Sequence, residues 1–226
     1  MQIKLLDQIG SVHIDLDSAN LFCVLGRVSD YSQELYPEER VDWGQMKRQR
    51  RLEYSSGRRV AHEALSMAIG ESLPVLTDER LPVWPKGWVG SISHTKNKAA
   101  AMLGRECDYA GIGIDLALQN SVTERIAERI TTPSERTTLA ADVSTQIFSA
   151  KEAVYKAVNP ISREFLGMRD VEIEFDKTGR KFRAKTLHQR RSTKIVTLGV
   201  GYIGTVENCW LSVFLVEPFY THCAIR

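Results

Sequence analysis

The sequence has few cysteines, and none of them has the spacing of a metal site. Its four cysteines form no CxxC motif, which favours reduced thiols in a cytoplasmic protein over a disulfide framework or a structural zinc site. They are Cys23, Cys107, Cys209 and Cys223. No apolar run approaches the roughly 18 residues of a membrane span, and the N-terminal segment has no cleavage pattern. We therefore expect a soluble cytoplasmic protein without a membrane span.

The sequence also has no strong excess of charge. Its formal net charge is +2, with 26% charged and 43% hydrophobic residues, which is ordinary for a globular protein. The basic run KRQRR at residues 47–51, followed by Arg58 and Arg59, suits a solvated helix face, a nucleic-acid patch or a phosphate site. The basic run has no interleaved aromatic residues, and the whole chain has no overall basic balance. We therefore expect that the protein does not bind nucleic acid. Two or three arginines are enough to bind a phosphate monoester.

Several common enzyme motifs are absent. There is no GxSxG elbow and no Walker loop, so the sequence does not support a function as a serine hydrolase or an ordinary kinase. HEALS at residues 62–66 lacks the second histidine of a zinc protease, and GIG at residues 111–113 lacks the third glycine of a dinucleotide fold. The length of 226 residues allows one large domain or two small packed halves.

Two segments carry charged residues on what we expect to be rigid elements. In FSAKEAVYKAV at residues 148–158, helical spacing places Glu152 and Lys156 on one face. Asp115 ends an apolar run in GIGIDL at residues 111–116, which is typical of a buried strand. Each feature also has an ordinary explanation, as a solvated ion pair or as a turn or cap residue. Together, two acids and a lysine could hold a divalent cation against a phosphorylated ligand.

A third segment, GSISHT at residues 90–95, combines small residues with hydroxyls and a histidine. Small side chains let a ligand approach the backbone, and Ser93 and His94 could donate hydrogen bonds to phosphate oxygens. A histidine at a strand end is also often a packing or capping residue.

The remaining pattern predicts mixed helices and strands. We expect helices at residues 45–69, with a break near Gly57, at 122–130, and at 144–158, where Asn159 and Pro160 would end the helix. Residues 81–88 should form an irregular loop. Strands are expected at 12–17, 20–25, 89–93, 98–103, 110–116, 171–175, 195–203 and 210–216. Asp115 lies near the midpoint of the chain, so we expect a site between two halves.

The order GSISHT, GIGIDL, FSAKEAVYKA resembles the three motifs of the 4'-phosphopantetheinyl transferases, in the longer, monomeric branch that activates siderophore and peptide synthetases. WPKG at residues 84–87 and GRRVAHEAL at 57–65 are also similar, so the resemblance spans most of residues 48–158. It implies an α+β fold of two similar α/β halves packed as a pseudo-dimer, with coenzyme A at their junction. Residues 1–110 would carry the coenzyme A phosphate-binding segments, and residues 111–226 the metal and catalytic segments.

The resemblance further implies a reaction. Such enzymes transfer the phosphopantetheine arm of coenzyme A to a serine of an apo acyl, peptidyl or aryl carrier protein and release adenosine 3',5'-bisphosphate. Asp115 and Glu152 would hold magnesium, with manganese as an alternative. Because a serine hydroxyl needs a base, Glu152 would also act in catalysis, with Lys156 and His94 on the phosphates. The implied coenzyme A-binding residues are Arg51, Arg58, Lys86, Ser93, His94 and Lys156.

One position departs from the family pattern. Many relatives have a metal-binding glutamate two residues after the motif aspartate, where this chain has Ala117. Magnesium tolerates retained waters, so two carboxylates remain workable, and Glu135 is a candidate replacement as well as a candidate helix-start acid. The departure also motivates a rival hypothesis, that the chain is a catalytically impaired coenzyme A-binding regulatory homologue.

Overall fold

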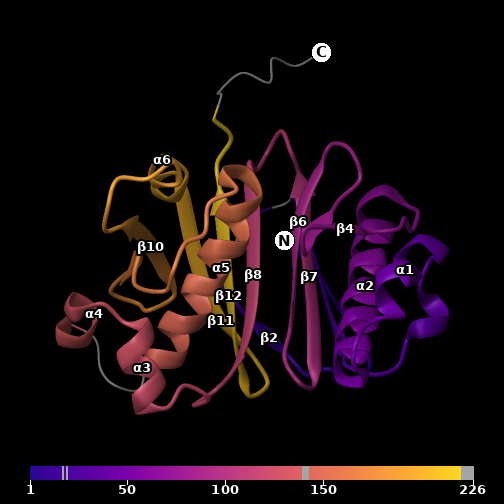
Figure 1. Cartoon of the computed structure of the whole chain (residues 1–226), viewed down its shortest axis with the longest axis horizontal. Coiled ribbons are helices and arrows are strands. Elements are labelled where there is room, and N and C mark those ends of the chain that lie inside the picture. Colours follow the sequence, from indigo (N-terminus) through magenta and orange to yellow (C-terminus); the bar gives the residue numbers. More distant parts are fainter. Residues whose placement is uncertain (17, 19, 139–142, 220–226) are drawn as a thin grey trace.

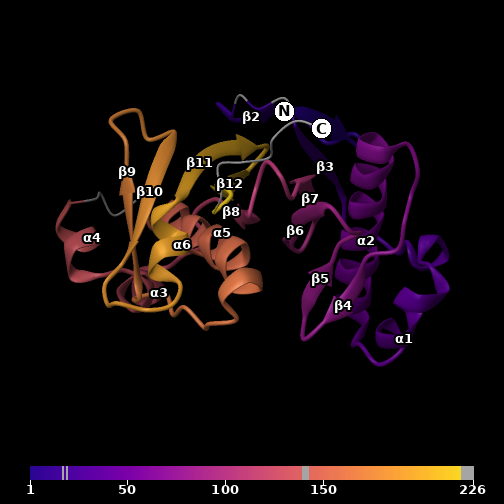
Figure 2. The ribbon, with the colours of Figure 1, turned by 90° about the horizontal axis from the view of Figure 1, so that it is seen from above.

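Two β-sheets pack face to face, and a long helix covers the outer face of each sheet (Figure 1). This computed structural model describes residues 1–16, 18, 20–138 and 143–219. Seen from above, α2 lies with β3 and β7 on one side, and α5 and α6 lie with β9 to β12 on the other (Figure 2). The arrangement confirms an α+β fold with two α/β halves. The division between residues 110 and 111 stays a prediction.

The first sheet has the strand order β1–β3–β7–β6, formed by Gln2–Leu5, Leu21–Arg27, Lys98–Arg105 and Trp88–His94. β1 is parallel to β3 and the other pairs are antiparallel. Helix α2, Arg48–Ile69, covers its outer face and ends at Gly70 in the left-handed conformation. The expected break at Gly57 is wrong. The helix continues through Gly57, and the glycine serves close packing, because a Cβ atom there would lie 3.0 Å from Ile92 of β6.

Three short helical segments and a hairpin complete the first half. The helical segments are Ser32–Glu34, Pro37–Glu39 and α1, Arg40–Trp43. The hairpin pairs β4, Leu76–Asp78, with β5, Leu81–Val83, through a two-residue turn at Glu79 and Arg80. The irregular loop expected at residues 81–88 is therefore partly a strand. Both turn residues have positive φ angles, 46° and 76°, as the twist of a tight hairpin requires.

The second sheet is antiparallel, with the order β8–β12–β11–β10–β9. Its strands are Gly111–Leu118, Cys209–Val216, Gly199–Val206, Lys181–Thr186 and Val171–Phe175. β2, Val12–His13, also pairs with β11, so the beginning of the chain joins the second sheet. Helix α5, Ser144–Ser162, packs on the outer face. The remaining helices are α3, Glu124–Ile130, α4, Pro133–Thr138, and α6, Thr193–Thr197.

The predicted boundaries of α5 and β11 are wrong, and the strand expected at residues 12–17 is limited to β2, Val12–His13. Helix α5 does not end at Asn159 and Pro160 but continues through Pro160 to Ser162. Pro160 removes one donor near the helix end, and the helix closes with Arg163 in the left-handed conformation, donating its N–H to Asn159 O. The strand expected from residue 195 begins at Gly199 instead, because Thr193–Thr197 is helical.

The core continues from one sheet into the other. Alternate residues of β3 and β7, including Leu21, Leu25 and Met102, pack against Ile114 and Leu211 of the second sheet. The opposite faces of the two sheets pack against α2 and α5. Within the described residues, no helix has the length and apolar character needed to cross a membrane. Cys23, Cys107 and Cys209 carry thiols rather than disulfides, and Cys223 lies outside the described residues.

Candidate active site

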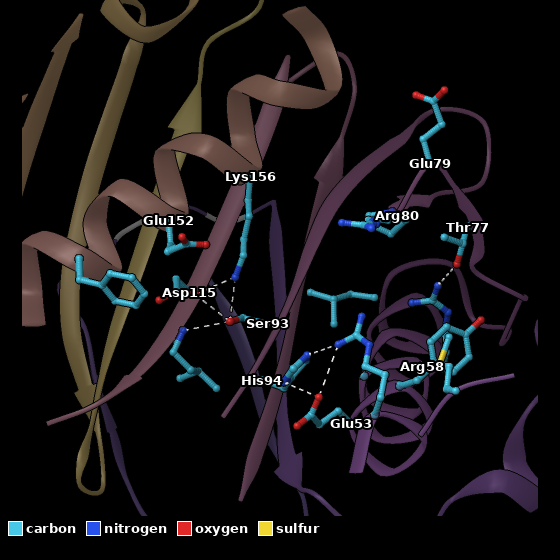
Figure 3. Close-up of a pocket in the computed structure, with 18 residues that line it drawn as sticks. Glu53, Arg58, Thr77, Glu79, Arg80, Ser93, His94, Asp115, Glu152 and Lys156 are labelled. Carbon is cyan, nitrogen blue, oxygen red and sulfur yellow. Dashed lines mark hydrogen bonds and ion pairs between the residues drawn. The ribbon is translucent and has the colours of Figure 1, made fainter. Parts of the chain in front are cut away.

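A cleft of about 1020 Å³ lies between the two halves (Figure 3). Its walls come from α2, the β4–β5 hairpin and β6 on one side, and from β8 and α5 on the other. In Figure 3, Glu152 and Asp115 lie on one side, with Ser93 of β6 next to Asp115, Arg58 and Thr77 lie on the other side, and Arg80 lies between them. The titratable residues of the lining are Arg50, Glu53, Tyr54, Arg58, Glu79, Arg80, His94, Asp115, Glu152 and Lys156.

The glycines of β8 explain how Asp115 reaches α5. A Cβ atom at Gly113 would lie 1.9 Å from Ala153 O, and one at Gly111 would lie 2.4 Å from Ala157 O. Because only hydrogen atoms fit there, the helix rests directly on the strand. Asp115 leaves the strand on the same face, since side chains two residues apart share a face. The sequence GxGxD therefore delivers a carboxylate to the helix that carries Glu152 and Lys156.

Asp115 is the centre of a buried hydrogen-bond network. Its Oδ1 accepts from Lys156 Nζ at 2.7 Å and from Ser93 Oγ at 3.0 Å. Ser93 Oγ in turn accepts from Lys156 Nζ at 3.0 Å and from Leu116 N at 3.1 Å. Asp115 is 5% exposed. The structure thus brings together residues of three separate segments, on β6, β8 and α5.

Glu152 lines the cleft one helical turn from Lys156. Burial raises the pKa of its carboxyl group, and the negative charge of Asp115 raises it further, whereas Lys156 acts in the opposite direction. A carboxylate with a raised pKa is a stronger base than an exposed one. Glu152 is therefore better suited than an exposed carboxylate to accept a proton from a hydroxyl group.

His94 is held from two sides by residues of α2. Arg50 Nη1 donates to His94 Nε2 at 2.6 Å, and Glu53 Oε2 lies 3.7 Å from His94 Nδ1. Burial lowers the pKa of His94, with a smaller contribution from the cations Arg50 and Lys156, while Glu53 and Asp115 oppose the shift. Because Nε2 accepts from a guanidinium, the ring is neutral in this arrangement and its other nitrogen carries the proton.

The arginines of α2 divide between the cleft and the surface. Arg58 is buried in the cleft wall, stacks on Tyr54 with 4.5 Å between its guanidinium and the ring, and donates to Thr77 Oγ1 at 2.8 Å. Arg51 instead stacks on Trp43 at 4.8 Å and donates to Gly44 O.

Two of the expected coenzyme A-binding residues do not reach the cleft. Neither Arg51 nor the exposed Lys86 belongs to the described residues that line it. Arg50 lies in the cleft instead of Arg51. Arg80 also lines the cleft, and sequence reasoning missed it. Helical spacing relative to Arg58 does not single out Arg50, because Arg51, seven residues before Arg58, lies closer to it in helical phase than Arg50 does.

The oxygen atoms around Asp115 suit a small divalent cation. Asp115 Oδ2 is buried and, among the described residues, has no hydrogen-bond partner. With Glu152 it offers two carboxylates, which are ligands that magnesium accepts together with waters. Within the described part of the chain, no group of three or more His, Cys, Asp or Glu side chains could hold a metal ion. Ala117, where the resemblance implies a third carboxylate, is buried on β8.

Glu135 does not replace the missing ligand, since both of its oxygens are engaged elsewhere. Oε2 accepts from Lys151 Nζ and from Thr132 N, each at 2.7 Å, and Oε1 accepts from Ile173 N at 2.8 Å. It is a helix-start acid of α4, the other role considered for it, and it is outside the cleft lining.

Two family models match the chain. Residues 37–104 match the 4'-phosphopantetheinyl transferase N-terminal domain, and residues 111–205 match the 4'-phosphopantetheinyl transferase superfamily. The 4'-phosphopantetheinyl transferase PptT of Mycobacterium tuberculosis is 32% identical over 152 residues, which cover 63% of this chain and 67% of that protein. The chain belongs to the 4'-phosphopantetheinyl transferase family.

Other similarities of this transferase are shorter. Enterobactin synthase component D of Salmonella typhimurium is 36% identical over 116 residues, which cover 49% of each chain. A crystal structure of Thermotoga maritima holo-[acyl-carrier-protein] synthase aligns with a TM-score of 0.38 and 21% identity, over 49% of this chain and 64% of that one. The family assignment makes the chain an enzyme, and its members use coenzyme A and act on carrier proteins.

Proposed function

We propose that this transferase moves the 4'-phosphopantetheine group of coenzyme A to a serine of an apo acyl or peptidyl carrier protein, with magnesium, and releases adenosine 3',5'-bisphosphate. The observation that carries the proposal is the convergence of Asp115, Glu152, Lys156 and Ser93 in one cleft between the halves. Similarity to enterobactin synthase component D supports carrier domains of siderophore synthesis as substrates.

In the proposed step, the serine oxygen of the carrier attacks the phosphorus atom that bears the pantetheine arm. A new P–O bond forms, the anhydride P–O bond breaks, and adenosine 3',5'-bisphosphate leaves. The serine proton passes to Glu152, directly or through a water. Asp115 and Glu152 would hold the magnesium ion, which supplies positive charge to the diphosphate.

The cations of the cleft would bind and orient the phosphates. Lys156 can exchange its contact with Asp115 for a phosphate oxygen, since its side chain is 24% exposed. A neutral His94 has one N–H to donate, and Arg50 and Arg58 lie on the α2 wall, across the cleft from Lys156, where they suit the 3'-phosphate. We propose Arg50 rather than Arg51 for this contact, because Arg51 is held on Trp43.

The test is intact-mass analysis of purified apo carrier proteins after incubation with coenzyme A and magnesium. Loading should add one phosphopantetheine per carrier, and Asp115→Ala and Glu152→Gln should each abolish it while the protein stays folded. If both variants loaded carriers at the normal rate, the site would be assigned wrongly.

A second candidate, a coenzyme A-binding regulator without transfer activity, is favoured by Ala117 and the two-carboxylate site. It predicts coenzyme A binding with no transfer at any magnesium or manganese concentration. A single observed turnover on one carrier would exclude it.

A further inference from the structure

Three buried oxygen atoms, one on Asp115 in the cleft lining and two on serines outside it, make no hydrogen bond within the described residues. They are Asp115 Oδ2, Ser149 Oγ and Ser212 Oγ. Ser149 and Ser212 are 0% exposed and Asp115 is 5% exposed. A buried hydroxyl without a partner is unfavourable, and most such groups in native proteins have a partner or serve a site. Two hydroxyls and one carboxylate oxygen without partners in one region therefore call for a common explanation.

The sheet register places Ser212 beside Asp115. The two residues are directly paired between β12 and β8, so their side chains leave the sheet on the same face. Paired residues of antiparallel strands have Cβ atoms about 4.5–5.5 Å apart. Ser212 thus lies on the β12 side of Asp115, whereas Ser93, which donates to Oδ1, belongs to β6 on the opposite side.

The packing of α5 on β8 places Ser149 near the same point. Ala157 of α5 lies over Gly111 of β8, and Ala153 lies over Gly113. Each step of two residues forward along the strand therefore matches a step of four residues backward along the helix. Continuing this relation by one step brings Ser149 over Asp115. The two serines therefore flank the carboxylate from the helix and from the neighbouring strand.

We propose that Ser149 and Ser212 are positioning residues of the metal site, which compensate for the alanine at position 117. Their hydroxyls, which make no hydrogen bond to Asp115 in this structure, accept hydrogen bonds from the waters that magnesium retains where a third carboxylate is missing. The inference rests on the proposed function, because it assigns these serines to the same metal site. It explains why two unsatisfied hydroxyls are kept in a core position where alanine would pack without cost.

The experiment compares Ser149→Ala, Ser212→Ala and the double variant with the wild type. Manganese binding to the protein–coenzyme A complex is measured by the loss of the free-ion electron paramagnetic resonance signal. Each substitution should weaken manganese binding about tenfold, the lower end of the effect of removing groups that orient metal ligands. Thermal unfolding without metal should be unchanged or shifted upward, because an unsatisfied buried hydroxyl has been removed.

Ser162→Ala is the matched control. This serine is in the last turn of the same helix, where it donates to Val158 O at 3.1 Å and accepts from Glu164 N at 3.2 Å. Loss of the Ser162 hydroxyl should lower the unfolding temperature and leave manganese affinity unchanged. This is the opposite of the result expected for Ser149→Ala and Ser212→Ala. A merely structural role for Ser149 and Ser212 would produce the control pattern.

Manganese affinities of both serine variants within twofold of wild type would overturn the inference. Asp115→Ala separates this failure from that of the proposed function. If Asp115→Ala lost manganese binding and carrier loading while both serine variants kept normal affinity, the proposed function would stand and the role of the serines would fall. A wild-type protein that neither bound manganese with coenzyme A nor loaded any carrier would overturn both.

Discussion

Gly113 of β8 lies directly beneath Ala153 of α5, so close that a Cβ atom on the glycine would be 1.9 Å from the alanine carbonyl oxygen. The strand and the helix that carry the candidate catalytic residues are thus in backbone contact. The relative position of Asp115 and Glu152 depends on this contact.

Gly113→Ala should therefore separate α5 from β8. We expect a loss of about 2–3 kcal/mol in the free energy of unfolding, typical of overpacking a core, and a fall in carrier loading because the two carboxylates move apart. Chemical denaturation and intact-mass analysis measure the two effects. Gly44→Ala is the control, since its Cβ would be 3.9 Å from Arg40 O and should change neither quantity. Equal behaviour of both variants would contradict the packing argument.

Arg50 and Arg51 are neighbours on α2 with different environments. Arg50→Gln should weaken coenzyme A binding about tenfold or more, because a charge-assisted hydrogen bond contributes about 1.5–3 kcal/mol. Arg51→Gln should leave the affinity within twofold and lower stability by about 0.5–1 kcal/mol, since it loses its stacking on Trp43. Isothermal titration with coenzyme A and thermal unfolding provide the two measurements. A larger loss of affinity from Arg51→Gln would restore Arg51 as the binding residue.

Glu207 joins the two sheets and should make stability depend on pH. It lies in the turn between β11 and β12 and accepts from Arg27 Nη2 at 2.6 Å and from Gly10 N at 3.0 Å, with Lys98 Nζ 2.9 Å away. The hydrogen bonds from Arg27, Gly10 and Lys98, in that order of size, lower the pKa of Glu207 from 4.5 to about 2. A lowered pKa stabilises the fold above pH 4.5, and this contribution disappears as the pH falls through about 2.

Glu207→Gln should accordingly lower the free energy of unfolding at pH 7 by about 1–2 kcal/mol, a modest value because the side chain is partly exposed. The difference from wild type should shrink below pH 4.5 and vanish near pH 2. Denaturant unfolding at several pH values tests this, with the exposed Glu71→Gln as control. A difference that stays constant down to pH 2 would argue against the ion pairs as its cause.

Lys151 has a structural role, in contrast to the neighbouring Glu152. Its Nζ donates to Glu135 Oε2 at 2.7 Å and to the carbonyl oxygens of Ile130 and Met168, each at 2.8 Å. Lys151→Met should lower the free energy of unfolding by about 3–5 kcal/mol, because it leaves the buried carboxylate of Glu135 without its cation. Adding Glu135→Gln should recover part of the loss. If the double variant were less stable than Lys151→Met, the buried charge would not be the reason.

The central residues of the site were predictable because simple periodicities fix them. Strand alternation sets Asp115 on the face of Gly113, and helical spacing sets Glu152 beside Lys156. The structure places both pairs around one point, with Ser93 from a third segment. Their proposed roles remain to be tested.

Other features depend on information that local pattern does not contain. The β4–β5 hairpin was missed because its turn, Glu79–Arg80, has no glycine or asparagine, and because β5 contains Pro82. Arg50 and Arg51 both lie in a basic run, and only the position of the cleft distinguishes them. Pro160 stays inside α5 although it removes one backbone donor, and the helix ends two residues later at Ser162.

The apolar layer between the sheets has a consequence for the behaviour of the whole molecule. Each sheet supplies one side of that layer, so cutting the chain between them would leave Leu21 and Met102 on one fragment, and Ile114 and Leu211 on the other, facing water. Melting should therefore be a single cooperative event, and catalytic competence should vanish in the same step as tertiary structure. Because the cleft is formed between the two halves, it is lost when the halves separate.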